Sequence, residues 1–265
     1  MTIVFTIASG KGGTGKTTVT SNLGSMLAYY KKRTYILDAD VGMANLGLVL
    51  GLERMPVSLH EVLAGKADVH DAIYEGPFGV NVIPSGLSLE GFKDANPDRL
   101  RDVMNEIVDE CDILIIDAPA GINHDGIVPL AVADEVILVV IPDISSILDA
   151  LKTKMLTEMI GGKIRGVILN RVNTENDDMT KEQIEKMLGV KVIAMIPEDA
   201  NVRRAAASRA PVVLKYPSSG ASKAFRKLAR DIAGIEESEA DKAVESNKKE
   251  KFVERLARAL FPGVR

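Results

Sequence analysis

Nine residues near the start of the chain, GKGGTGKTT at 10–18, constrain its fold more than any other feature. The apolar run at 3–8 precedes them, and an Ala- and Leu-rich stretch at about 17–31 follows them. The spacing G-x-x-x-x-G-K-[ST] between a strand and a helix is typical of a loop whose backbone N–H groups cradle nucleotide phosphates. In such a loop Lys16 reaches the terminal phosphates and the Thr17 hydroxyl holds Mg²⁺. The sequence therefore predicts a strand, a phosphate-binding turn and a helix at the amino end.

Runs rich in Val, Ile and Leu alternate with helical patterns along the rest of the chain. This alternation indicates βαβ units, and nearly continuous apolar runs are typical of parallel strands covered on both faces. We therefore expect an α/β fold of the P-loop NTPase type, with a doubly wound, mainly parallel sheet flanked by helices. The expected strands lie at 2–8, 33–38, 80–84, 111–117, 134–141, 164–169 and 191–196. Capping boxes at 58–61 and 180–183, and the pair Asn96-Pro97, indicate where three helices begin.

Composition narrows the classes of protein to consider. With 265 residues, 46% of them hydrophobic, and a formal net charge of -4, the chain can bury one sizeable core, and its surface as a whole does not attract nucleic acid. The single cysteine, Cys111, excludes an internal disulfide and reads as a small buried hydrophobe. His60, His70 and His124 lack metal-ligand spacing. No apolar run reaches the ~20 residues that span a bilayer, and Met1-Thr2 leads straight into the first strand, so we expect a cytoplasmic protein.

The chain divides into three parts by composition. Residues 1–234 carry the alternating pattern and form the expected nucleotide-binding domain. Residues 235–247 contain five acidic side chains against one lysine and almost no large apolar ones, which predicts a solvated linker. Residues 248–265 reverse the charge, with six Lys or Arg against two Glu. The last part therefore has a different role from the core.

Aspartates follow two of the expected strands. Asp117 ends the apolar run at 113–116, the position where doubly wound folds hold Mg²⁺, and Gly121 comes shortly after it. Asp38 and Asp40 end the second run, and two carboxylates spaced by two point the same way from an extended chain. An isolated Asp-x-Asp is usually a solvated turn. Beside the phosphate loop, it predicts carboxylates near the metal, its waters or an attacking water.

Taken together, KGGTGKTT at 11–18, DAD at 38–40, DAPAG at 117–121 and the basic C-terminal segment make the chain resemble the MinD/ParA family of deviant Walker A ATPases, which includes the nitrogenase iron protein. The resemblance covers the whole length. It implies a Mg²⁺-dependent ATPase that closes around ATP as a homodimer. It also explains the second lysine of the loop, Lys11, which in the family crosses the dimer interface to the partner's phosphates.

The resemblance assigns roles to individual residues. It implies that Asp40 orients or activates the attacking water and that Asp38 supports Mg²⁺ through water. The expected catalytic residues are Lys11, Lys16 and Asp40. The expected Mg²⁺ residues are Thr17, Asp38 and Asp117. The expected nucleotide-binding residues are Gly10, Lys11, Gly12, Gly13, Thr14, Gly15, Lys16, Thr17, Thr18, Gly121, Asn170, Pro197, Glu198 and Asp199.

The choice of base rests on the strand at 164–169. It leads into Asn170-Arg171-Val172-Asn173, which lacks the aspartate of the Asn-Lys-x-Asp guanine signature, so ATP is favoured over GTP. Family members place an asparagine at the Asn170 position near adenine, although Asn170 as a plain strand-end residue stays open. The resemblance also suggests that Asp143 and Asp149 pair with Lys11 in one nucleotide state, unless they simply form a solvated helix face.

The C-terminal segment predicts a basic amphipathic helix. Its apolar stripe, flanked by lysines and arginines, is typical of a helix that lies in the interface of an anionic membrane. The expected membrane residues are Phe252, Val253, Leu256, Leu260 and Phe261. A terminal helix docked on its own core would show the same stripe and remains the alternative.

The main hypothesis is a MinD-like ATPase that dimerises on ATP and cycles on and off the inner face of the cytoplasmic membrane, positioning a protein cargo or regulator, in division-site placement. The second is a DNA-partitioning ATPase of ParA type. It requires a basic patch on the core, for which Arg203, Arg204 and Arg209 are the nearest candidates, and we do not expect nucleic acid as a partner. A metal-cluster carrier is the third, and the lone cysteine argues against it.

Overall fold

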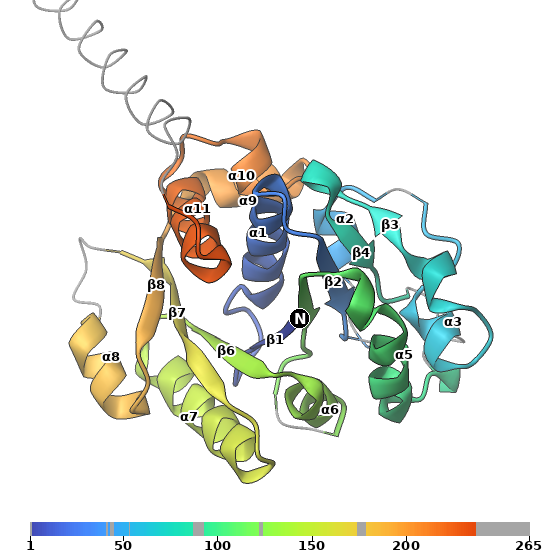
Figure 1. Cartoon of the computed structure of the whole chain (residues 1–265). Coiled ribbons are helices and arrows are strands. Elements are labelled where there is room, and N and C mark those ends of the chain that lie inside the picture. The colour runs from blue at the N-terminus through green and yellow to red at the C-terminus, as the bar shows by residue number, and fades with distance from the viewer. Residues whose placement is uncertain are drawn as a thin grey trace, which may run out of the picture.

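An eight-stranded sheet forms the centre of the computed structural model, which describes residues 2–40, 42, 45–52, 54–86, 93–121, 124–173 and 179–236 (Figure 1). The strands follow the order β3-β4-β2-β5-β1-β6-β7-β8. All described pairings are parallel except that of β3 with β4. The strand bounds are β1 Ile3–Ala8, β2 Thr34–Asp38, β3 Tyr74–Glu75, β4 Asn81–Ile83, β5 Ile113–Asp117, β6 Glu135–Val140, β7 Ile164–Val172 and β8 Val192–Pro197. The seven predicted strands are confirmed, and β3 is an addition.

Helices cover both faces of the sheet (Figure 1). Helices α1 and α11 pack on one face, while α3 and α5 cover one half of the other face and α6, α7 and α8 the other half. The helix bounds are α1 Lys16–Tyr29, α2 Leu46–Val49, α3 Leu59–Leu63, α5 Leu100–Ile107, α6 His124–Val132, α7 Ile144–Met159, α8 Lys181–Leu188, α9 Ala200–Ala207, α10 Val212–Lys215 and α11 Gly220–Ala233. Together with the parallel sheet, this arrangement confirms the predicted fold class.

The two-sided burial explains the continuous apolar runs. In β5, Ile113 and Ile115 pack toward α1 and α11, whereas Leu114 and Ile116 pack toward α3 and α5. Because successive side chains of a strand point to opposite faces, a strand covered on both sides needs an apolar residue at every position. Cys111 is buried just before β5, and this burial raises the pKa of its thiol to about 11. It behaves as the small hydrophobe that the sequence predicts.

Local signals at the helix starts are also confirmed. The hydroxyl of Ser58 accepts from the backbone of α3 while Glu61 accepts from the Ser58 N–H, and Thr180 and Gln183 make the same exchange at α8. Asn96 caps a short 3₁₀ turn ahead of α5 by accepting from the Asp98 N–H. Each cap satisfies backbone groups that a helix end leaves without intrahelical partners.

Glycine inside α1 reflects close packing on the sheet. A Cβ at Gly24 would lie 2.3 Å from Cδ1 and 2.7 Å from Cγ1 of Ile36, a fully buried residue of β2. Alanine is favoured over glycine in a helix by about 1 kcal/mol, but overpacking a core costs about 1–3 kcal/mol.

We therefore expect Gly24→Ala to lower the free energy of unfolding by about 1–2 kcal/mol in urea titrations. Ile36→Val removes the nearer methyl group and should recover part of that loss in the double variant, although it costs about 0.5–1.5 kcal/mol alone. Strict additivity of the two effects would show that the contact with Ile36 is not the reason for the glycine.

Candidate nucleotide site at the carboxyl edge of the sheet

The glycine-rich loop joins β1 to α1, as predicted, and its glycines serve different needs. A Cβ at Gly10 would lie 2.1 Å from the backbone carbonyl carbon of Asp149 in α7, so the loop can approach that helix only without a side chain. Gly13 and Gly15 have φ values of 80° and 95°, in the left-handed region. At Gly12, by contrast, a Cβ would meet Ala120 only at 4.0 Å. Among the described residues, therefore, no contact requires a glycine at position 12.

The first turn of α1 is tied to the end of β5. The Thr17 hydroxyl donates to one oxygen of Asp117 at 2.6 Å, and the Thr20 hydroxyl donates to the other at 3.0 Å. Lys16 is buried beside them, and its charge opposes the rise in the pKa of Asp117 that burial causes. Thr17 and Asp117 thus meet as the sequence predicts. Thr20 was missed, although its position three residues after Thr17 places it on the same face of the helix.

Asp38 lies next to Asp117 because β2 and β5 pair in the register Asp38↔Asp117. The Asp38 carboxylate is buried and accepts from the Asp40 N–H at 3.1 Å and from the Leu46 N–H at 3.2 Å. It therefore fixes the chain that follows β2 and the first residue of α2. The side chain of Asp40 begins at the same edge of the sheet.

Two neighbouring carboxylates, Asp38 and Asp117, are buried at this edge, and their negative charges are unfavourable there. Burial, followed by the charge of Asp117, raises the pKa of Asp38 well above its usual value. Burial also raises the pKa of Asp117 to about 6, although Thr17, Lys16 and Thr20 oppose the effect. A divalent cation would favour the ionised form of both groups.

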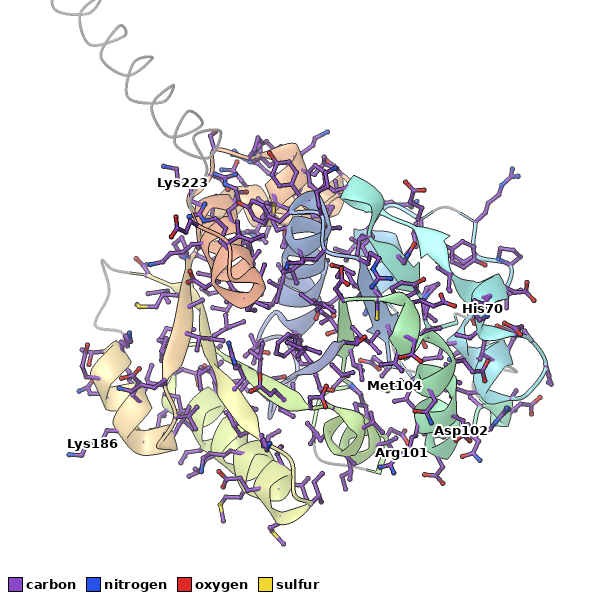
Figure 2. The ribbon with its side chains drawn as sticks, viewed as in Figure 1. His70, Arg101, Asp102, Met104, Lys186 and Lys223 are labelled. Atoms are coloured by element: carbon purple, nitrogen blue, oxygen red, sulfur yellow. The ribbon has the colours of Figure 1, made fainter. Side chains whose placement is uncertain are left out.

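The donor set fits Mg²⁺. It consists of two carboxylates and the Thr17 hydroxyl, and oxygen ligands are those that Mg²⁺ prefers. Within the described part of the chain no three His, Cys, Asp or Glu side chains gather as a metal cluster. Mg²⁺ commonly completes its shell with phosphate oxygens and water. His70 lies elsewhere, near α5 (Figure 2), and its ring nitrogens form hydrogen bonds with Asp68 and Glu110.

Lys11 is held at the start of α7. Its Nζ lies 3.2 Å from both carboxylate oxygens of Asp143 and 3.3 Å from the Ser145 hydroxyl. Burial raises the pKa of Asp143, but hydrogen bonds from the Ser146 N–H and from Lys11 outweigh it and the pKa falls below its usual value. The expected pairing of Lys11 with Asp143 is thus present.

The expected pairing of Lys11 with Asp149 is not present in this structure. The Asp149 carboxylate pairs instead with Lys152 on the same helix, at 3.1 Å, which fits the alternative of a solvated helix face. The Lys11 Nζ contacts Asp143, the N-cap of that helix. What Asp149 contributes to the loop is its backbone, against which Gly10 packs.

A cavity of about 120 Å³ lies beside the loop where β7 and β8 end. Its lining contains the residues expected around the base together with residues not expected there, two of them arginines; the set comprises Gly15, Thr18, Asn170, Arg171, Pro197, Glu198, Asp199, Val202 and Arg203. The cavity is small, and it opens next to the loop that would hold phosphates. Its place suits the base and sugar of a nucleotide.

Two residues that line this cavity, Asn170 and Asp199, also stabilise neighbouring backbone. The Asn170 amide donates to the Thr14 carbonyl at 2.7 Å, and a Cβ at Gly15 would lie 2.2 Å from the same nitrogen. Asn170 therefore braces the phosphate loop, a role that the sequence did not indicate. Asp199 caps α9 through the Asn201 N–H and accepts from the Ala221 N–H of α11. Gly121, with φ of 92°, allows the turn that follows β5.

Comparison with known proteins agrees with this geometry. Residues 5–212 match the family described as the CobQ/CobB/MinD/ParA nucleotide binding domain. The chain belongs to the MinD/ParA family. An uncharacterized ATP-binding protein of Methanocaldococcus jannaschii is 48% identical over 261 residues, which is 98% of this chain and 97% of that protein. The septum site-determining protein MinD of Synechocystis is 34% identical over 241 residues, covering 88% and 90% of the two chains.

Solved structures show the same likeness. The cell division ATPase MinD of Pyrococcus furiosus superposes with a TM-score of 0.85 at 39% identity, over 88% of this chain and 99% of its own. The septum site-determining protein MinD of Pyrococcus horikoshii, solved as a complex with Mg-ADP, has a TM-score of 0.84 at 38% identity, over 88% and 96%.

The expected membrane residues Phe252, Val253, Leu256, Leu260 and Phe261 lie outside the described residues, as do the rest of the segment 248–265 and all but the first two residues of the linker. None of the helices among the described residues has the length and hydropathy of a membrane span.

The raised pKa of Asp117 predicts that neutralising this side chain has opposite effects on protein stability and on ATP binding. Its folded pKa of about 6 lies above the ordinary aspartate value of 3.8, so the stability that this group contributes falls as the pH rises through that interval. Asn keeps the shape, because one threonine hydroxyl still donates to Oδ1 and the other turns to accept from Nδ2. We expect Asp117→Asn to stabilise the nucleotide-free protein at about pH 8 by ~1–3 kcal/mol, and to weaken Mg²⁺-dependent ATP binding about ten-fold or more.

The stability gain should shrink toward pH 5 in thermal melts, because protonation then removes the charge from the wild type as well. Asp112, at the other end of β5, is the control, since its ion pair with Arg33 lowers its pKa. Asp112→Asn should give no gain at pH 8. A loss of stability for Asp117→Asn that is equal at both pH values would contradict the account.

Proposed function

We propose that this protein is a Mg²⁺-dependent ATPase that dimerises on ATP and cycles on and off the inner face of the cell membrane to position other proteins, in division-site placement. One observation carries the proposal. The phosphate loop has two lysines, and only Lys16 lies inside its own site, whereas Lys11 reaches outward to Asp143. A second lysine is needed if another subunit completes the site.

The residues divide the chemistry of hydrolysis among them. The loop N–H groups bind the phosphates of ATP, and Lys16 neutralises charge on the terminal ones. Thr17, Asp117 and Asp38 hold Mg²⁺, directly or through water. Asp40 orients the attacking water and accepts its proton. Mg²⁺ supplies charge neutralisation between the phosphates when it is bound.

Lys11 supplies the link between hydrolysis and assembly. Here it pairs with Asp143 of its own chain, and in the ATP-bound dimer it would leave that carboxylate for the phosphates of the partner subunit. Gly12 supports this assignment, because no contact with another described residue of the chain requires a glycine there. A dimer interface against the loop would require one. Loss of the terminal phosphate would then weaken the contacts between subunits.

Membrane binding is assigned to the C-terminal segment 248–265. A single helix with about five apolar contacts binds anionic lipid weakly and reversibly. Two copies in one dimer gain an avidity of about 10² or more if both reach the bilayer. Dimerisation by ATP therefore suffices to switch membrane residence, without a permanent anchor.

A protein partner belongs to the proposal as well. Helix α7 exposes an apolar row beside Lys11, formed by Ile144, Leu148, Met155 and Met159, of which Met159 is 81% exposed. Contiguous exposed apolar side chains are typical of protein-binding surfaces. A MinD of Aquifex aeolicus, a 30% identical neighbour, was solved in complex with MinC.

The alternative is a DNA-partitioning ATPase of ParA type. The structure offers one observation in its favour, a group of basic side chains between β8 and α11 in the core, although the expected candidates Arg203, Arg204 and Arg209 are not part of it. An ATP-dependent shift of duplex DNA that survives removal of the tail would favour this alternative over membrane cycling.

Sizing of the protein with ATP tests the dimer. Asp40→Ala should trap a species of twice the monomer mass, because binding persists while hydrolysis stops. Lys11→Ala should weaken ATP-dependent dimerisation about ten-fold or more, the effect of losing a charge-assisted contact. Lys186→Ala, which removes an exposed lysine on α8 (Figure 2), is the matched control and should dimerise normally. A fully dimeric Lys11→Ala protein would refute the role of Lys11.

Liposome sedimentation tests the membrane switch. We expect the wild type to pellet with anionic vesicles in ATP and to remain largely in the supernatant in ADP, since one helix per monomer binds weakly. Deletion of 248–265 should abolish pelleting while ATP-dependent dimers still form. Equal pelleting in ATP, in ADP and after the deletion would rule out the switch but leave the dimer assignment intact.

A further inference from the structure

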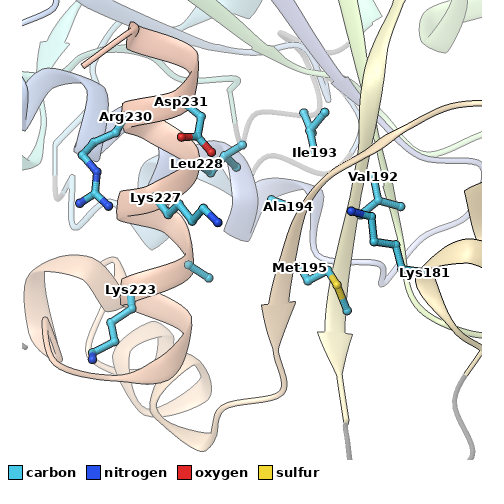
Figure 3. A pocket seen from close by; sticks show the side chains of 11 residues that line it. Lys181, Val192, Ile193, Ala194, Met195, Lys223, Lys227, Leu228, Arg230 and Asp231 are labelled. Atoms are coloured by element: carbon cyan, nitrogen blue, oxygen red, sulfur yellow. The ribbon is translucent and has the colours of Figure 1, made fainter. Parts of the chain in front are cut away.

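A basic groove lies between β8 and α11, outside the nucleotide site (Figure 3). We call it the β8–α11 groove; its volume is about 590 Å³. Lys223, Lys227 and Arg230 line it from α11, and Lys181 at the start of α8 lies on the far side of β8 (Figure 3). Against these four cations the lining contains one carboxylate, that of Asp231. The net positive charge indicates an anionic occupant.

The floor of the β8–α11 groove is apolar. Val192, Ala194, Met195 and Leu228 contribute to its lining, and Met195 is 42% exposed. Strand β8 is also the terminal strand of the sheet, so its outer edge pairs with no other strand among the described residues. Open sheet edges beside alternating pockets are typical sites for an extended peptide. The shape and the floor therefore favour a peptide over a duplex phosphate backbone.

We propose that the β8–α11 groove binds the acidic segment 236–245 of this same chain. The segment begins where the groove begins, because α11 ends at Ala233 and the Ile235 N–H donates to the Arg230 carbonyl. Its formal charge is complementary, with five acidic side chains against Lys242. A short tether of this kind gives an effective concentration of about 1 mM, so weak individual contacts suffice.

The two rows of charges are also of comparable length. Glu237, Glu239 and Asp241 alternate along the sequence, so in an extended chain they point the same way, about 6.6 Å apart. On α11 the cations at 223 and 227 are four residues apart and those at 227 and 230 three, which gives steps of about 6.0 and 4.5 Å along the axis. A segment that turns back at Gly234, whose φ is 65°, would place its acidic row beside this basic row.

This docking would set where the basic segment 248–265 starts. It would hold that segment beside α11 and would depend on salt, because the contacts are ion pairs near the surface. The inference does not depend on the proposed function, since neither ATP nor a membrane enters its test.

Cross-linking of the full-length chain tests the docking. The variant Met195→Cys/Ala240→Cys places one thiol in the groove and one in the segment, and Met187→Cys/Ala240→Cys, with its first thiol on the exposed face of α8, is the matched control. Buried Cys111, with its pKa raised to about 11, stays unreactive in the native protein. Under mild oxidation we expect an intrachain disulfide that forms about ten-fold faster for the groove pair and independently of protein concentration.

Charge variants decide whether the cations are responsible. Lys223→Glu/Lys227→Glu should reduce the groove pair to the rate of the control, and Glu237→Lys/Glu239→Lys added to it should restore the rate. Equal rates for the two cysteine pairs would overturn the proposal, as would rates unaffected by charge reversal. Disulfides between chains would assign the groove to a second copy instead. Duplex DNA that binds the wild type and is lost on charge reversal, without a fast intrachain disulfide, would assign it to nucleic acid.

Discussion

The buried carboxylate of Asp117 positions the parts of this protein that its nucleotide chemistry requires. It ends β5, accepts from Thr17 and Thr20 in the first turn of α1, and pairs in register with Asp38. Burying a charge is costly unless neighbours satisfy it, and burial raises the pKa of Asp117 to about 6 even though two hydroxyls and Lys16 act against the rise. The uncompensated charge is therefore a feature of the site, because groups with perturbed pKa values gather where a protein binds ions or performs chemistry.

Most of the sheet could be predicted because burial on both faces leaves a continuous apolar signature. Ile113 to Ile116 illustrate it, since alternate residues enter different halves of the core. The two-residue strand β3 gave no such signal, because no periodicity exists in so short a segment. The order of the strands in the sheet could not be predicted from the sequence either. That β1 lies between β5 and β6 depends on which helices cross which face, and the apolar runs do not encode it.

The candidate site shows the same division between local and distant causes. The loop, Asp38 and Asp117 were predictable, since motif spacing fixes their place on strand ends. The bond from Asn170 to Thr14 joins residues 156 positions apart, and the contact of Gly10 with Asp149 joins two separate elements. Such contacts depend on packing and leave no pattern in the sequence. For this reason spacing along α7 did not show that Asp143 holds Lys11 while Asp149 meets the loop through its backbone.

The strength of the Lys11–Asp143 pair is what makes the proposed exchange between subunits possible. Both side chains are partly exposed, 30% and 42%, and a pair of this kind contributes at most about 1 kcal/mol. Several phosphate oxygens in a closed dimer interface would give Lys11 a larger gain in interaction energy, because the negative charges there are more numerous and less screened by water. The ion pair with Asp143 is therefore strong enough to position Lys11 but too weak to prevent its transfer to the partner's nucleotide. Since Gly10 packs against the same helix, release of Lys11 in the proposed dimer would change the contacts of α7 as well as those of the loop.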